Sequence, residues 1–87
     1  MERTVTIGSA VGLHARPASI FVQAVVTSGA AVTLTTAEGA TVNAASILSV
    51  LSLGLPFGAE VTLASSDAAA VESLSALLTT DLDRSND

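Results

Sequence analysis

His14 is the only histidine of the chain, and it stands at the predicted start of a helix, with Arg16 two residues later. The first turn of a helix has unpaired N–H groups and a partial positive charge, so it attracts anions and disfavours cations. Two side chains that can both be cationic are therefore unfavourable there unless an anion binds. A histidine ring nitrogen can accept a phosphoryl group, and the planar fork of an arginine can hold its oxygens. The pair predicts a phosphohistidine site.

The candidate residues also have ordinary structural interpretations. A single histidine at a helix start is commonly a solvent-facing side chain, and the stem of Arg16 can simply cover apolar surface. Ser46 precedes a short apolar run, and serine is among the best helix N-caps, so capping alone explains it. The residue types therefore leave a functional and a purely structural role open at each position.

The sequence around His14 closely resembles a known signature. Residues 12–18 read GLHARPA, which is similar to the active-site motif of HPr, the family of histidine-containing phosphocarriers in the bacterial phosphoenolpyruvate:sugar phosphotransferase system. Residues 46–54, SILSVLSLG, resemble the second signature of that family, and GAEV at 58–61 fits it too. The resemblance extends in order over nearly the whole chain.

The resemblance implies a phosphoryl carrier and not a stand-alone enzyme. His14 would accept a phosphoryl group at Nδ1 from phosphorylated enzyme I and pass it to the IIA domains of sugar transporters. Arg16 and the backbone N–H groups of Ala15 and Arg16 would hold the phosphoryl oxygens. Ser46 matches a serine that a dedicated ATP-dependent kinase phosphorylates in some bacterial lineages, so this kinase and a phosphatase would be further partners. No metal ion or cofactor is implied.

The segment after Ser46 has more apolar residues than a short helix can bury on one side. Some of them must face water, and an apolar patch near a phosphoryl site is typical of a docking surface. The resemblance places Ile47, and with it Leu48, on the face that meets enzyme I and the IIA domains, and Leu51 is a further candidate for this docking face. Many family members have lysines around this face, whereas this chain has no lysine, so we expect weaker electrostatic steering and more apolar recognition.

Composition limits the other classes of function. A formal net charge of −5 argues against nucleic acid or an anionic membrane surface as a partner. The most apolar stretch, residues 44–57, is too short and too rich in serine to cross a bilayer, and the N-terminus lacks the apolar run of a signal peptide. The absence of cysteine is compatible with a reducing cytoplasm. We therefore expect a cytoplasmic monomer that is not inserted in a membrane.

Two alternatives come from other functional classes. A binding module of the same fold would regulate its partners through Ser46 and the apolar patch, with His14 idle. The presence of both His14 and Arg16 favours the carrier, since a pure regulator needs neither. An acyl carrier protein has a similar size and acidity, but the Asp-Ser-Leu motif that it requires at a helix start is absent.

The length of 87 residues predicts a single domain, residues 1–87. Alternating apolar and polar residues predict four strands, near 4–7, 32–35, 41–43 and 60–64. Helical spacing predicts a helix from the His14 turn to Gly29, a short one capped by Ser46 and a third capped by Asp67. The βαββαβα order predicts an α/β (α+β) fold, an open-faced sandwich with an antiparallel sheet and its helices on one face. The resemblance implies the strand order 1-4-2-3.

The interior is expected to consist of Ala, Val, Leu and Ile around Phe21 and Phe57, because only 2% of the residues are aromatic. The turn at Glu38-Gly39 joins two strands through a loop of several residues, so the sequence does not define the register of this hairpin. The polar residues 83–87 are expected to fray.

Overall fold

The structure, a computed structural model, describes residues 1–81. Its elements follow the predicted order and are β1 (Glu2–Thr6), α1 (Ala15–Ser28), β2 (Thr33–Thr36), β3 (Thr41–Asn43), α2 (Ile47–Ser52), β4 (Glu60–Ala64) and α3 (Ala68–Leu78). The fraying expected for residues 83–87 lies outside the described part of the chain.

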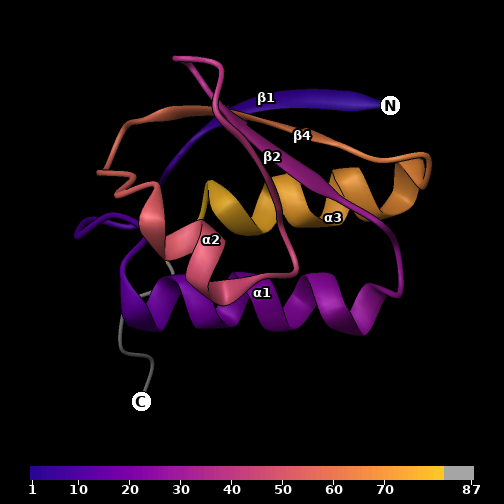
Figure 1. Ribbon diagram of the computed structural model, residues 1–87, viewed down its shortest axis with the longest axis horizontal. Helices are drawn as coiled ribbons and strands as arrows, with labels where there is room; N and C mark the ends of the chain where they lie inside the picture. Colours follow the sequence, from indigo (N-terminus) through magenta and orange to yellow (C-terminus); the bar gives the residue numbers. More distant parts are fainter. Residues whose placement is uncertain (82–87) are drawn as a thin grey trace.

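The strands form one antiparallel sheet in the order β1-β4-β2-β3, which confirms the expected topology. The helices lie together on one side of this sheet, with α1 and α3 packed against each other and α2 packed against α1 (Figure 1). The fold is therefore the open-faced sandwich that the element order predicts. The hairpin register that the sequence left open pairs Leu34 with Val42 across β2 and β3.

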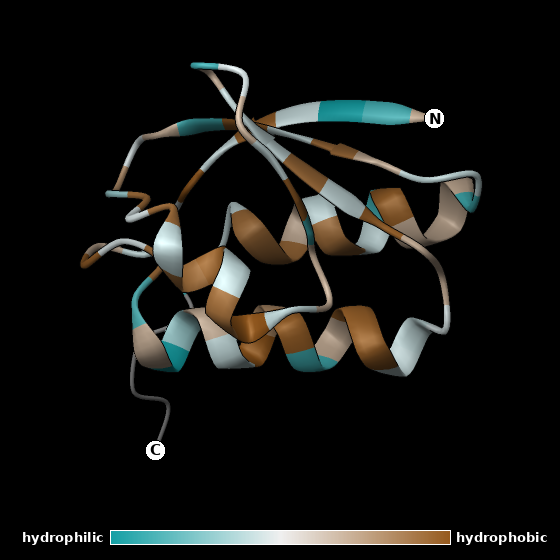
Figure 2. Cartoon of the chain, viewed as in Figure 1, coloured by the Kyte–Doolittle hydropathy of each residue, from teal (hydrophilic) through white to brown (hydrophobic). Residues whose placement is uncertain are grey.

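The core lies between the helices and the sheet. The predicted stripe on α1 is buried, as are the inward residues of β4 and α3: Ala18, Phe21, Val22, Val25, Val61, Leu63, Val71, Leu74 and Leu78. Figure 2 shows this as hydrophobic segments along the helices, whereas much of β1 is hydrophilic. Buried residues recur at regular intervals along α1, β4 and α3, and they define how α1 packs over the sheet. They thereby also define the position of His14, the residue that precedes α1.

The prediction that Phe57 belongs to the core is wrong. Its side chain is 63% exposed, whereas Phe21 is fully buried. Ala59 N donates a hydrogen bond to Pro56 O (3.1 Å), so Phe57 and Gly58 are the central residues of a turn. Gly58 has a φ of 83°, which is the geometry that a type II turn requires of its second central residue. The turn leaves Phe57 in solvent, while Leu55 of the same loop fills the interior.

The helix boundaries follow the capping signals of the sequence. Ser46 Oγ accepts a hydrogen bond from Ser49 N (3.3 Å), and Asp67 Oδ1 accepts one from Ala70 N (3.1 Å). Both predicted N-caps are therefore confirmed. Gly29 ends α1 in the left-handed conformation, at a φ of 71°, where glycine has no Cβ penalty.

Candidate functional site

His14 is the N-cap residue of α1, and its side chain is exposed. Its backbone is extended (φ −100°, ψ −162°), and its carbonyl accepts the first helical hydrogen bond from Ala18 N at 2.9 Å. Its side chain makes no capping hydrogen bond. The residue is thus fixed by its backbone, while the imidazole is left available at the surface.

Arg16 lies in the first turn of α1 and is exposed. The first-turn N–H groups of Ala15 and Arg16 have no carbonyl one turn earlier to bind, and Pro17 has no N–H to offer. The other arginine within residues 1–81, Arg3, is 3.6 Å from Glu72, whereas Arg16 makes no ion pair there. The structure therefore brings together an imidazole, two open backbone donors and an uncompensated guanidinium.

Gly12 holds the segment before His14 against the loop that follows α2. Leu13 N donates to Leu55 O at 2.8 Å, and Gly12 N donates to Ser9 O at 2.9 Å. Gly12 has a φ of 81°, and a Cβ there would lie 2.6 Å from Leu55 O. Glycine is thus needed both for the backbone conformation and for the close approach.

The end of α3 holds the same segment from the other side. Gly8 N donates to Leu78 O at 2.9 Å, and Ala10 N donates to Asp81 Oδ1 at 3.4 Å. Ser9 Oγ donates to Thr80 O at 3.5 Å. Sequence reasoning missed Asp81, because its partner Ala10 lies 71 residues away and no local pattern marks the pair. Residues 8–13, which lead to His14, are therefore held by hydrogen bonds to the loop after α2 and to the end of α3.

The apolar residues of α2 divide between the core and the surface. Val50 is fully buried, while Leu48 is 77% exposed and confirms that this helix has more apolar side chains than it can bury. Ile47 and Leu51 are half-buried and pack against the core. Because α2 packs on α1, this surface adjoins the helix that begins at His14.

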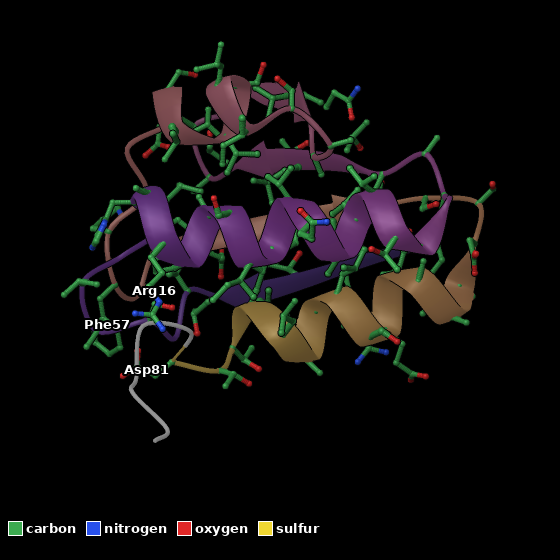
Figure 3. All side chains as sticks on the ribbon, turned by 90° about the horizontal axis from the view of Figure 1, so that it is seen from below. Arg16, Phe57 and Asp81 are labelled. Carbon is green, nitrogen blue, oxygen red and sulfur yellow. The ribbon has the colours of Figure 1, made fainter. Side chains whose placement is uncertain are left out.

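Two further apolar side chains near the site were not predicted as surface residues. Phe57 is 63% exposed and Val11 is 51% exposed. Figure 3 shows Arg16, Phe57 and Asp81 at the same end of the molecule. The exposed face around His14 is therefore broader than the α2 surface alone.

Within residues 1–81, no three His, Cys, Asp or Glu side chains are grouped as metal ligands would be. In the same part of the chain, no helix has the length and apolar character that crossing a membrane would take.

Comparisons with known proteins identify the relatives of the chain. Residues 1–80 match the family model described as the PTS HPr component phosphorylation site. The chain is 58% identical over 64 residues to the phosphocarrier protein HPr of Streptomyces coelicolor, a match that covers 74% of this chain and 69% of that protein.

Solved structures agree with these matches. The fold is similar to that of an HPr from Thermoanaerobacter tengcongensis, with 30% identity, a TM-score of 0.86 and 99% of each chain covered. It is also similar to an HPr from Bacillus anthracis, with 32% identity, a TM-score of 0.83, and 90% of this chain and 95% of that chain covered. The chain belongs to the HPr family, the phosphocarrier proteins of the phosphotransferase system.

Proposed function

We propose that His14 accepts a phosphoryl group from phosphorylated enzyme I and passes it to the IIA domains of sugar transporters, with the protein acting as a cytoplasmic monomer. An unprotonated ring nitrogen of His14 attacks phosphorus, the bond between phosphorus and the donor breaks, and the donor keeps that electron pair. The second transfer reverses these roles, because the IIA acceptor attacks phosphorus and His14 is the leaving group.

The observation that carries this proposal is the uncapped N-terminus of α1. Side chains cap α2 and α3, at Ser46 and Asp67, whereas α1 begins at His14 with no side-chain cap. A capping side chain typically stabilises a helix by about 1 kcal/mol. Leaving the first-turn donors of α1 open therefore supports a bound anion there, and membership of the HPr family supports phosphate on His14.

The geometry suits a carrier, which must hold the phosphoryl group without trapping it. The backbone donors of Ala15 and Arg16 are neutral dipoles, and Arg16 provides a single full charge. Its guanidinium is exposed, so solvent and salt screen its attraction for phosphate. The phosphorylated state is therefore only moderately stabilised, and a IIA acceptor can compete for the phosphoryl group.

Phosphorylation with phosphoenolpyruvate and a catalytic amount of enzyme I tests the proposal. We expect the intact mass to increase by one phosphate group, which is lost in acid and retained in base, as is usual for phosphohistidine. An unchanged mass, or a phosphate that survives acid, would contradict the assignment.

An Arg16→Ala variant should transfer the phosphoryl group about 10- to 100-fold more slowly, since a hydrogen bond to a charged group is worth about 1.5–3 kcal/mol. The side chain is exposed, so the free energy of unfolding should change little. Rapid-quench measurement of phosphorylation and dephosphorylation rates checks this. Arg3→Ala is the matched control, because it removes an arginine that pairs with Glu72 away from His14. Equal rates in both variants would show that the backbone donors suffice without Arg16.

The docking patch, defined as Ile47, Leu48 and Leu51, is proposed to contact enzyme I and the IIA domains. Leu48 is the most exposed large apolar side chain in the described part of the chain. Since the chain has no lysine to attract an acidic partner, binding should depend mainly on apolar contact and only weakly on salt.

A Leu48→Asp variant should raise the KM of enzyme I for this protein by more than about 10-fold, because burying an unpaired charge in an apolar interface is costly. Thermal stability should change little, since the side chain is 77% exposed. Leu48→Met keeps the apolar surface and should behave like the wild type. A steep salt dependence of the wild-type KM, or normal KM in Leu48→Asp, would mean that docking occurs elsewhere.

The alternative is a binding module that acts through Ser46 while His14 is idle. Ser46 Oγ already accepts the capping hydrogen bond of α2, so a structural role accounts for it without a serine kinase or phosphatase. A phosphate on Ser46 would lie at a helix N-terminus and place negative charge beside the docking patch. This alternative predicts phosphorylation only by an ATP-dependent kinase, and none by enzyme I.

A further inference from the structure

We infer that Phe57 and Val11 form a second apolar contact for the phosphoryl donor, in addition to the docking patch. This inference rests on the proposed function, because its occupant is the protein that phosphorylates His14. The donor would then contact two apolar surfaces of the carrier, the docking patch and the pair Phe57 and Val11.

Exposure is the first observation behind this contact. Only 2% of the residues are aromatic, yet Phe57 is 63% exposed. Val11 is 51% exposed, three residues before His14. Single exposed apolar residues are common and mean little. Two of them on segments that are hydrogen-bonded to each other, one of which leads to His14, are instead typical of an interaction surface.

Hydrogen bonds join the loop that contains Phe57 to the segment that contains Val11 and leads to His14. Leu13 N donates to Leu55 O at 2.8 Å, and Gly58 N donates to Ile7 O at 2.9 Å. The loop that contains Phe57 is therefore tied at both ends to the segment that contains Val11. These hydrogen bonds restrain the backbone on either side of Phe57, which lowers the entropy cost of ordering the loop on binding.

The area that a typical protein interface covers is large enough for the donor to reach Phe57. Transfer requires the phosphorus of the donor to approach bonding distance of the His14 ring, so the donor must cover the surface around it. A standard interface covers about 800 Å² of each partner, a disc with a radius of roughly 16 Å. The protein measures only 33 × 29 × 21 Å, and Phe57 lies at the same end as Arg16 (Figure 3). A donor that covers the surface around Arg16 at this end of the molecule would therefore also reach Phe57.

The chemistry of this face favours an apolar contact over an electrostatic one. Arg3 and Arg16 are the only lysine or arginine residues within 1–81, and Arg3 is paired with Glu72. Arg16 faces the phosphoryl group in the proposed mechanism. Aromatic side chains, phenylalanine included, are enriched in protein interfaces relative to the rest of the surface.

Steady-state phosphorylation by enzyme I, with this protein as the varied substrate, tests the inference. Phe57→Ser should raise KM by about 10-fold, equivalent to about 1.4 kcal/mol, without changing kcat or the final extent of phosphorylation. Phe57→Leu keeps an apolar side chain and should restore KM to within about 3-fold of wild type. Thr33→Ala, on the exposed face of β2, is the distal control and should leave KM unchanged.

Each outcome has a distinct meaning. An unchanged KM in Phe57→Ser, or a lower kcat at unchanged KM, would overturn the docking contact, since the residue would then be inert or act on the chemical step. Failure of the wild type to be phosphorylated would instead overturn the proposed function. Should Phe57→Ser have a lowered Tm, Val11→Ser provides the second test, and a normal KM in that variant would equally overturn the inference.

Discussion

A His14→Ala variant is expected to take up no phosphate from phosphoenolpyruvate and enzyme I, whereas the wild type takes up one. Alanine offers no nucleophilic nitrogen, and the described residues contain no second histidine or any cysteine to replace it. The side chain of His14 makes no capping hydrogen bond, so its loss should leave the fold intact. Intact-mass spectrometry together with thermal unfolding separates the lost chemistry from a lost fold.

Ser46→Ala is the control for this variant. It removes the hydroxyl of Ser46, the other predicted phosphorylation site, and with it the side-chain cap of α2. The variant should therefore be less stable by about 1 kcal/mol, yet it should still accept the phosphate from enzyme I. The mass of one phosphate group could persist in His14→Ala, or it could be lost in Ser46→Ala although that variant is folded. Either result would assign the phosphate to a residue other than His14.

A Gly12→Ala variant is expected to be destabilised by about 2–4 kcal/mol, which is large for a small domain. Two effects combine, because an alanine at a φ of 81° is strained and its Cβ would lie 2.6 Å from Leu55 O. Relief requires the segment before His14 to move away from Leu55, which breaks the hydrogen bond from Leu13 N. We therefore expect a Tm lowered by roughly 10 °C or more, together with slower phosphoryl transfer.

Gly29→Ala is the matched control for the steric part of this effect. Gly29 also has a positive φ, of 71°, but no atom lies within 4 Å of the position that a Cβ would occupy. Its replacement should cost only the backbone strain, about 1–2 kcal/mol, and should leave the transfer rate unchanged. Equal destabilisation of the two variants would show that the contact between Gly12 and the loop after α2 does not constrain the site.

The parts of the fold that follow local rules could be predicted from the sequence. The spacing of Ala18, Phe21, Val22 and Val25 predicts the buried stripe of α1, and all four are buried. Ser46 and Asp67 precede α2 and α3 and cap them as expected. These features depend on periodicity and on side-chain hydrogen bonds within a few residues, so a single sequence contains them.

The features that depend on contacts between distant loops could not be predicted. Phe57 is as apolar as Phe21, and only the turn from Pro56 to Ala59 places it in solvent. The requirement for glycine at position 12 depends on the carbonyl of Leu55, which approaches from a separate loop. The exposure of Leu48 is expected from the sequence and is confirmed, whereas the packing of α2 on α1 leaves Ile47 and Leu51 only half-buried.

The most direct test of the carrier proposal follows the phosphate after enzyme I has been removed. The phosphorylated protein is isolated, mixed with a IIA domain in the absence of phosphoenolpyruvate, and both proteins are measured by intact mass over time. We expect the mass of one phosphate group to leave this chain and appear on the IIA domain. Phosphate that stays on this chain, or that is released only to water, would contradict a role as a carrier.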